Sequence, residues 1–519
     1  MGYDTETNYN FGYFSFLNPY QIRFNMIARG LAFPEIGPDF NACELGFGNG
    51  VSIVMHAVNS SVNWYGNDFN PAQVSFAQML ADTAHTKVHL SDDAFDQFLE
   101  REDLPMFDYI CLHGIFSWIS EENRDIIVEF IKRHLKIGGV VYISYNVHAG
   151  FGNTEPFRYL MYSYIHNFGD KNKSHVQNIP QALDFIDKLI ELSPAYTQNA
   201  PWAKEHYHSR IVKQNHNYVA HEFLNSNWFI EDSHDIATLL EPAKLNFVGQ
   251  ACLVDDFNEL SFSQEELEFL AQYEGTALYQ SVRDYVMGQL FRRDLFVKGA
   301  ISLNEYQKIV ELDKTYFLLV QNKDAEQLTI NTRIGTQNVD LKRIDYLLKF
   351  MSDYDFHSFK EMREALSIEH AKQKTKHLVP VSRLIDDLTY AQGTGILLVT
   401  VPPEHMTQNI LANSHELNMA ILNSHLPAQL TVLSAPALGG AFVVEEVHKF
   451  LLSIVLTKPE TTEDDLTCYL MTFLSETGNT FKYQGRTIAE PKEQLPLVRD
   501  MIHDFVAWRL PTIRKLCCI

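Results

Sequence analysis

The sequence has few of the features that mark membrane or secreted proteins. Its 519 residues include only six cysteines, and none of these forms a C-x-x-C pair, so no disulfide framework is indicated. No apolar run approaches the roughly 18 residues of a membrane span. The first residues lack the basic start and apolar stretch of a signal peptide. We therefore expect a cytoplasmic protein with reduced thiols and no membrane span.

Positive charge is scarce as well. The 42 Lys and Arg residues are outnumbered by 65 Asp and Glu residues, which gives a formal net charge of −23. Phosphate binding needs a basic surface, so this composition argues against a nucleic-acid partner. An acidic surface favours a basic or lysine-rich partner, although acidity also serves solubility alone.

Motifs of hydrolases, P-loop enzymes and metal sites are missing too. The sequence has no G-x-S-x-G and no Walker loop. His206, His208 and His216 lie close together in the sequence, but no pattern of carboxylates accompanies them. We therefore expect no bound metal.

The most informative stretch that is present is a glycine-rich segment at the turn from a predicted strand into a predicted helix. Glu44, Gly46, Gly48 and Gly50 form E-x-G-x-G-x-G. Such glycines let the chain turn tightly and let a ligand approach the backbone in front of the helix N-terminus. The spacing differs from the dinucleotide fingerprint, and a carboxylate at Glu44 would repel a pyrophosphate. A ligand with an ammonium group, such as S-adenosylmethionine, suits this segment better.

Strands and helices alternate around this segment, as they do in a parallel sheet that is covered on both faces. We predict an α/β fold with a seven-stranded, doubly wound, Rossmann-like sheet. The predicted strands are 41–45, 63–67, 86–90, 107–112, 140–144, 244–251 and 291–297. Ligands of such sheets bind at the carboxyl ends of the strands.

Several residues fall at these carboxyl ends. Asp68 follows the second strand, where nucleotide sites hold ribose hydroxyls. Asp92, Asp93 and Ala94 follow the third strand, where a carboxylate can accept the adenine amino hydrogens, and the aspartates can also cap the next helix. His113 follows the fourth strand and can contact the cofactor.

The succession of these motifs resembles a known family. The glycine motif is followed by Asp68, by Asp93-Ala94 and by Gly138-Gly139 before the fifth strand. This order resembles class I S-adenosylmethionine-dependent methyltransferases. The resemblance implies that S-adenosylmethionine is the cofactor.

Four further segments look like a narrower group, the rickettsial outer-membrane-protein lysine methyltransferases, which carry a methyltransferase regulatory domain. These segments are 113–118, 144–151, 221–225 and 291–299. The likeness covers residues 1–300 well and the rest loosely. At 149–151 the chain has Ala-Gly-Phe where the group often has Pro-Gly-Trp. The resemblance implies methylation of protein lysines and dimerisation through a helical insertion.

Methyl transfer to lysine needs an aligned amine with a free lone pair. Removing the ammonium proton at pH 7 costs about 4–5 kcal/mol from a pKa near 10.4, and an apolar channel lowers this cost. His113 is the candidate base, or it only packs at the strand end. Trp118 is a candidate channel wall, and Tyr145 and Asn146 are candidates to accept the hydrogens of the amine. The aromatic residues expected to line the channel are Phe14, Phe116, Trp118, Tyr145 and Phe151.

The chain divides into five predicted regions. The first is an aromatic arm, which serves as a lid over the cofactor or as a packing segment. After it come a cofactor-binding domain, a helical insertion, a region that completes the sheet with the regulatory domain, and an α+β region. Their ranges are 1–40, 41–154, 155–220, 221–300 and 301–519, the last with two modules at 301–405 and 406–519. Residues 340–400 have the order helix, helix, strand, which fits a small winged helix or an unrelated α+β module.

Three functions stay open at this point. The first is a lysine methyltransferase that acts on a protein with accessible lysines. The second is a methyltransferase for a small molecule or a cell-envelope saccharide. The third is a cofactor-binding interaction protein without turnover. Acceptor specificity resides in the shape of the site, so the sequence does not separate the first two.

Overall fold

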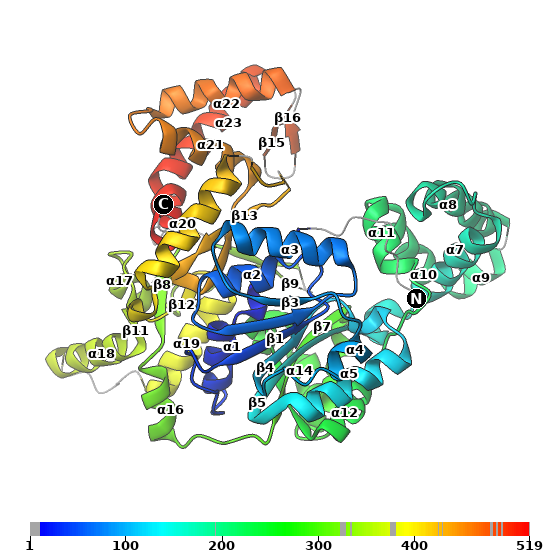
Figure 1. Cartoon of the computed structure of the whole chain (residues 1–519), viewed down its shortest axis with the longest axis horizontal. Helices are drawn as coiled ribbons and strands as arrows, with labels where there is room; N and C mark the ends of the chain where they lie inside the picture. The colour runs from blue at the N-terminus through cyan, green and yellow to red at the C-terminus, as the bar shows by residue number, and fades with distance from the viewer. Residues whose placement is uncertain are drawn as a thin grey trace.

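A seven-stranded sheet forms the centre of the computed structural model (Figure 1). The structure describes residues 11–192, 194–321, 328–332, 335–373, 380–423, 425–427, 429–477, 481–483, 486–488, 491–517 and 519. The strand order is β3-β2-β1-β4-β5-β7-β6. The strands are β1 (Asn41–Leu45), β2 (Asn63–Asn67), β3 (His89–Ser91), β4 (Phe107–Leu112), β5 (Leu135–Asn146), β6 (Leu245–Gln250) and β7 (Phe291–Lys298).

The strand directions complete this topology. β1 to β5 run parallel, whereas β7 is antiparallel to both β5 and β6. The predicted seven-stranded doubly wound sheet is confirmed. The carboxyl ends of β1, β2 and β4 therefore meet at one edge of the sheet, where such folds bind ligands.

Two predicted element ends shift. The third strand begins at His89 rather than at residue 86. The fifth strand starts directly after α5, at Leu135, and its pairing with β4 changes register before Val140. Gly138, with φ +81°, occupies this irregular stretch. The Gly138-Gly139 pair expected before the fifth strand thus lies in a bulge near the start of β5.

Side chains alternate between the two faces of the sheet. Tyr109 and Cys111 of β4 pack into one core, and Ile110 and Leu112 pack into the other. Helices α2 and α3 cover the first face, and α4, α5 and α12 cover the second (Figure 1). These helices are α2 (Val51–Val58), α3 (Pro71–Thr83), α4 (Phe95–Leu99), α5 (Glu121–His134) and α12 (Ser233–Leu240).

The helical insertion forms a lobe that projects from the sheet (Figure 1) and has a core of its own, built from residues 151–224. Its second long helix begins at His175 and contains Pro180 in its interior. The helices of this part of the chain are α6 (His148–Phe151), α7 (Glu155–Phe168), α8 (His175–Leu192), α9 (Pro194–Asn199), α10 (Pro201–Tyr207) and α11 (His216–Phe223).

The chain then returns to the sheet and adds its last two strands. A buried ion cluster ties β7 to the helix before it: Arg292 of β7 donates to Asp284 of that helix at 2.7 Å and to Asp294 of the same strand at 2.9 Å. All three side chains are at most 1% exposed. The helices of this part are α13 (Asn258–Ser261), α14 (Gln264–Leu270) and α15 (Tyr279–Met287).

Two α+β modules follow. The first contains the antiparallel sheet β11-β8-β12, and α18 and α19 precede β12 in the predicted order helix, helix, strand. Its elements are α16 (Glu305–Leu312), β8 (Tyr316–Leu319), β9 (Thr329–Thr332), β10 (Gly335–Asn338), α17 (Asp345–Phe350), β11 (His357–Ser358), α18 (Phe359–Gln373), α19 (Val381–Gly393) and β12 (Leu397–Thr400).

The last module packs on α2 and shares the core of that face of the sheet. Asn59 at the end of α2 donates to the Gly440 carbonyl of this module at 2.7 Å. Its elements are α20 (Gln408–Leu422), β13 (Val432–Ala435), β14 (Gly440–Val443), α21 (Glu446–Thr457), α22 (Glu463–Thr477), β15 (Phe481–Tyr483), β16 (Arg486–Ile488), α23 (Pro491–Asp504) and α24 (Leu510–Cys517).

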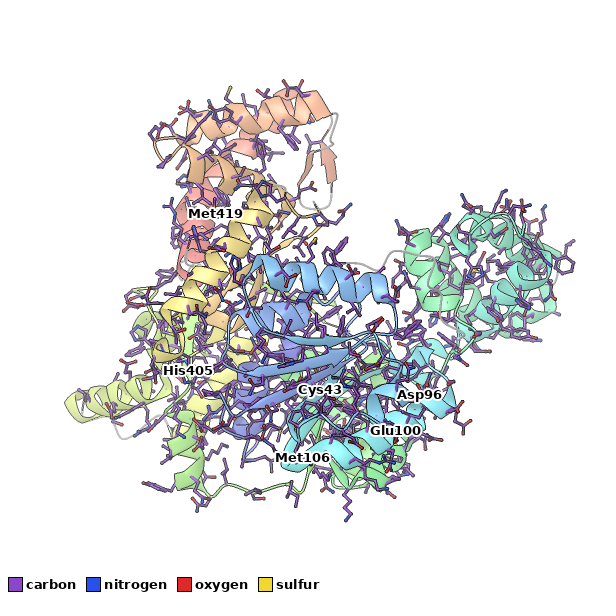
Figure 2. All side chains as sticks on the ribbon, viewed as in Figure 1. Cys43, Asp96, Glu100, Met106, His405 and Met419 are labelled. Atoms are coloured by element: carbon purple, nitrogen blue, oxygen red, sulfur yellow. The ribbon has the colours of Figure 1, made fainter. Side chains whose placement is uncertain are left out.

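The N-terminal arm lies between the sheet and these modules. Residues 1–10 of the predicted arm fall outside the described residues. The arm continues into α1 (Pro19–Ala28). The Asn18 amide donates to the Leu438 carbonyl at 2.7 Å, and the Tyr20 hydroxyl lies 3.0 Å from His405 Nδ1. Figure 2 marks His405 beside the sheet. The C-terminal half therefore holds the arm in place.

Two composition-based expectations have structural counterparts. The described cysteines at 43, 111, 252, 468 and 517 occur as thiols, and Cys43 lies in the middle of the sheet (Figure 2). Within the part of the chain that the structure describes, no helix combines the length and the hydropathy that crossing a membrane requires.

Candidate functional site

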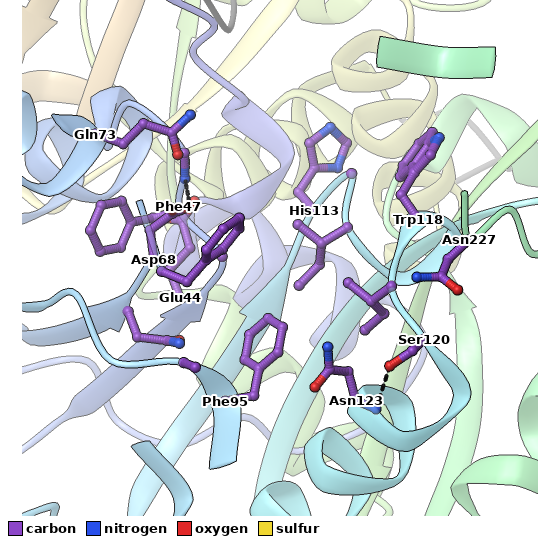
Figure 3. A pocket seen from close by; sticks show the side chains of 18 of the residues that line it. Glu44, Phe47, Asp68, Gln73, Phe95, His113, Trp118, Ser120, Asn123 and Asn227 are labelled. Atoms are coloured by element: carbon purple, nitrogen blue, oxygen red, sulfur yellow. Dashed lines mark hydrogen bonds between the residues drawn. The ribbon is translucent and has the colours of Figure 1, made fainter. Parts of the chain in front are cut away.

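A cavity of about 260 Å³ opens at the carboxyl ends of β1, β2 and β4 (Figure 3). Figure 3 shows Glu44, Phe47 and Asp68 on one side, Trp118 and Asn227 on the other, and His113 between them. The lining residues are Phe14, Glu44, Gly46, Phe47, Gly48, Asn67, Asp68, Phe69, Gln73, Ala94, Phe95, His113, Gly114, Ile115, Trp118, Ile119, Ser120, Asn123 and Asn227.

The three glycines of the motif have two different uses. All three have positive φ, between +60° and +68°, which non-glycine residues rarely adopt. Gly46 and Gly48 line the cavity, so their bare backbone faces a ligand. Gly50 does not line it. A Cβ at Gly50 would lie 2.4 Å from the Cβ of Ala77, so this glycine allows α2 and α3 to pack closely.

Two oxygen atoms of the cavity wall are buried hydrogen-bond acceptors. Glu44 Oε2 and Asn67 Oδ1 are buried, and neither has a hydrogen-bond partner among the described residues. Burial, together with the nearby charge of Asp68, raises the pKa of Glu44 to about 8. A buried acceptor without a partner is costly, so the site is built for a ligand that brings hydrogen-bond donors.

Asp68 braces the glycine loop from the end of β2. Its Oδ2 accepts from the Gly48 N–H at 2.9 Å, and its Oδ1 accepts from the Asn70 N–H at 3.0 Å. The Gln73 amide, turned to donate, lies 2.8 Å from the same carboxylate. Burial raises the pKa of Asp68 to about 6, while the two backbone N–H groups lower it. A ribose hydroxyl can pair with this carboxylate in place of the Gln73 amide.

The third strand contributes Ala94 and Phe95 to the cavity, but not the two aspartates. Asp92 is exposed, and Asp93 accepts from the Ser91 hydroxyl and lies 3.3 Å from Arg101. The capping alternative for the pair is wrong, because the N-cap position of α4 is Ala94. The aspartates lie in the turn beside the site, and Phe95 is the side chain that faces a ligand.

His113 lines the cavity and is tightly held. Its Nδ1 lies 2.9 Å from the Tyr142 hydroxyl and 3.1 Å from Ser144 Oγ. The Phe14 ring packs on the imidazole, with 4.1 Å between the ring centroids. Burial, assisted by the charge of Arg293, lowers the pKa of His113 to about 3. The imidazole is therefore neutral at physiological pH and is a weak proton acceptor.

The other residues expected to contact the methyl acceptor fall into two groups, one at or beside the cavity and one away from it. Trp118 lines the cavity, and its indole N–H donates to the Glu222 carbonyl at 3.2 Å. Asn146 donates to Glu222 Oε1 at 2.7 Å. Tyr145 does not line the cavity: its hydroxyl donates to Asp294 at 2.6 Å in the buried ion cluster.

Of the five aromatic residues expected around an acceptor channel, two line the cavity. Phe14 and Trp118 do so. Phe116 and Tyr145 pack in the core under the second face of the sheet, and Phe151 packs in the core of the helical insertion. Position at a strand end therefore did not decide which way these rings point.

Sequence reasoning did not single out several lining residues. Asn67 is the last residue of a predicted strand, so its place at the rim could have been found from the strand pattern. Phe47 and Gln73 carry no such signal. Asn227 comes from the loop after α11, far away in the sequence, and only the fold brings it to the site.

Metal binding has no counterpart in this region. Among the residues with described positions, no group of three or more His, Cys, Asp or Glu side chains is placed to hold an ion.

Known proteins share this architecture. Residues 215–298 match the family model of a predicted methyltransferase regulatory domain. The chain is 30% identical over 518 residues to the Synechocystis protein sll1526, across 99% of this chain and 98% of that protein. The Rickettsia prowazekii protein RP789 is 22% identical over 347 residues, which are 63% of this chain and 58% of that protein.

A solved structure is similar over nearly the whole length. PKMT2 from Rickettsia typhi, in complex with AdoHcy, superposes with a TM-score of 0.64 at 18% identity, across 97% of this chain and 98% of that chain. This likeness shows a common fold. With the strand order, the glycine loop and the regulatory domain, it confirms the resemblance found in the sequence. The chain belongs to the family of sll1526, has the fold of PKMT2 and, at residues 215–298, matches the predicted methyltransferase regulatory domain.

Proposed function

We propose that this protein transfers methyl groups from S-adenosylmethionine to lysine side chains of an acceptor protein. The observation that carries the donor half of this proposal is a pair of buried acceptors, Glu44 Oε2 and Asn67 Oδ1, that have no hydrogen-bond partner within the described part of the chain. Both line one cavity with the bare backbone of Gly46 and Gly48. An ammonium group and ribose hydroxyls are donors that such acceptors require.

Each part of the donor has a group that suits it. Glu44 would hold the ammonium group, and Asp68 would hold the ribose hydroxyls while it braces the loop. Phe95 and Ala94 would border the adenine. When bound, S-adenosylmethionine supplies a methyl group on a positively charged sulfur. The residues of the chain bind it, orient it and keep water away from it. Phe14 of the N-terminal arm closes one wall, in keeping with a lid.

The acceptor half of the proposal rests on the opposite wall of the cavity. Ile115, Trp118 and Ile119 make that wall apolar, which disfavours an ammonium ion and favours the neutral amine. The net charge of −23 would attract a lysine-rich chain. The resemblance to the rickettsial outer-membrane-protein lysine methyltransferases points to the same acceptor.

We extend the proposal to a homodimer built through the helical insertion. This lobe exposes large apolar side chains that a soluble monomer would tend to cover. Their exposed fractions are 58% for Tyr159, 78% for Phe168, 83% for Leu192 and 50% for Trp202. The thiol state of the described cysteines favours a cytoplasmic setting. Light scattering coupled to gel filtration would measure the dimer directly.

The substrate is tested by methyl transfer from donor labelled with tritium in its methyl group. The acceptors are denatured cell-surface proteins, and the products are hydrolysed to amino acids. Label in methyl-lysines supports the proposal, and an Asp68→Ala variant supplies the background. Label only in small molecules or saccharides would favour the second candidate acceptor class. Donor binding without any labelled product would indicate a binding protein without turnover.

A further inference from the structure

One carboxylate of the regulatory domain reaches the acceptor side of the site. Glu222 lies on α11, within the segment 215–298 that matches the regulatory-domain model. Its backbone carbonyl accepts from the Trp118 indole N–H at 3.2 Å, and its Oε1 accepts from the Asn146 amide at 2.7 Å. Glu222 therefore bridges the segment after β4 and the carboxyl end of β5.

Through Trp118, Glu222 adjoins the wall of the cavity. Trp118 lines the cavity, and so does Asn227, five residues after Glu222 in the chain (Figure 3). Asn227, in the loop after α11, thus lies on the side opposite Glu44 and Asp68.

The surroundings of Glu222 favour exchange of a proton. The residue is partly exposed. Burial of its carboxyl group raises the pKa to about 7, and the hydrogen bond from Asn146 lowers it. On its own helix, Tyr218 faces it, and the charge of Glu222 helps burial to raise the pKa of that phenol to about 12. From the neighbouring strand loops the facing groups are the neutral Asn146 and Trp118.

We propose that Glu222 receives the ammonium group of the acceptor lysine and removes its proton before methyl transfer. This inference rests on the proposed function and adds a residue to it. The carboxylate takes one proton and becomes a neutral carboxylic acid, which leaves a neutral amine. The nitrogen lone pair then forms a bond to the methyl carbon while the carbon–sulfur bond breaks, and its electron pair stays on sulfur. The methylated ammonium product carries the positive charge that the sulfonium loses.

Other candidate bases are already engaged. The Nδ1 atom of His113 is held by the hydroxyls of Tyr142 and Ser144. The Tyr145 hydroxyl is bound to Asp294 away from the cavity. Glu222, in contrast, adjoins Trp118 of the apolar wall, and its carboxylate accepts from Asn146. The regulatory domain would then act directly in the reaction.

The decisive variant is Glu222→Gln in the full-length protein. Glutamine keeps an oxygen that accepts from Asn146, but it does not take up a proton. We expect donor affinity and the urea unfolding midpoint to stay unchanged, while lysine methylation falls about 100-fold or more. We also expect the variant to lose the acidic limb of the wild-type pH–rate profile. Glu222→Asp should recover part of the rate, and Glu205→Gln, an exposed carboxylate of the same lobe, should match wild type.

Three results would overturn the inference. Equal rates and equal pH profiles for wild type and Glu222→Gln would remove the proton-accepting role. A parallel loss of donor binding or of the unfolding midpoint would assign Glu222 a structural role. If wild type binds donor but labels no lysine, the proposed function fails and the inference falls with it, whereas labelling by both proteins contradicts the inference alone.

Discussion

Replacing Glu44 with glutamine should stabilise the ligand-free protein at alkaline pH and weaken its binding of S-adenosylmethionine. Glu44 is only 4% exposed, and its Oε2 has no hydrogen-bond partner among the described residues. Ionising such a carboxyl group in the empty site is costly, whereas an ammonium group from the donor would favour the ionised form.

The magnitude follows from the pKa. It rises from an ordinary value of 4.5 to about 8 in the folded chain, which corresponds to about 5 kcal/mol at most, at about 1.4 kcal/mol per pH unit. The folded chain holds this proton more tightly than the unfolded chain. The contribution to stability is therefore fully present below pH 4.5 and is lost as the pH rises through about 8. Relaxation of the site reduces the measurable difference to roughly 2–4 kcal/mol.

Urea unfolding at pH 5.5 and pH 8 measures this difference. Wild type should lose more stability between the two pH values than Glu44→Gln does. Glu100→Gln, which alters an exposed carboxylate (Figure 2), should behave as wild type. Equal losses in wild type and Glu44→Gln would refute the assignment of a raised pKa to Glu44.

Binding gives the complementary test. If the donor ammonium pairs with Glu44, binding releases a proton from it, and affinity rises with pH up to about 8. Calorimetry in two buffers with different ionisation enthalpies counts that proton. The amine of the ligand also titrates near this pH, so its proton release is measured with Glu44→Gln and subtracted from the wild-type value. Identical proton release by wild type and variant would contradict the pairing.

Two further substitutions test the structure around the site. Gly50→Ala should destabilise the chain by about 2–4 kcal/mol in urea unfolding, because the new Cβ meets Ala77 at 2.4 Å, whereas Gly30→Ala, at a similar φ with open space, should cost only about 1–2 kcal/mol. Equal losses would remove the packing role. Tyr145→Phe should lower stability by about 1–3 kcal/mol through the lost hydrogen bond to Asp294, yet leave the methylation rate within a few-fold, and a large loss of rate at full stability would place Tyr145 in the reaction.

The sheet and the donor side of the site could be predicted because their signals are local. The apolar strands, the turn glycines and Asp68 follow each other within a short stretch of chain, and each strand end fixes its neighbours at the same edge. Glu44, Gly46 and Gly48 accordingly appear at the cavity. Gly50 shows the limit, because a packing glycine and a ligand glycine look alike in sequence.

The acceptor side was less predictable because it depends on faces and on long-range contacts. Tyr145 stands near the carboxyl end of β5, but adjacent strand residues point to opposite faces, and its ring enters the core beside Asp294. Asn227 reaches the cavity from the loop after α11, and Glu222 adjoins the cavity wall from α11 itself. Their place is set by the docking of α11, which no periodicity in the sequence encodes.

Calorimetric titration of the full-length protein with S-adenosylmethionine and S-adenosylhomocysteine tests the central claim most directly. We predict one site per chain with micromolar affinity for both ligands, weakened by about 1–3 kcal/mol in Asp68→Ala. The absence of binding to either ligand, by a protein that is folded in the same buffer, would contradict the assignment of this cavity to the methyl donor.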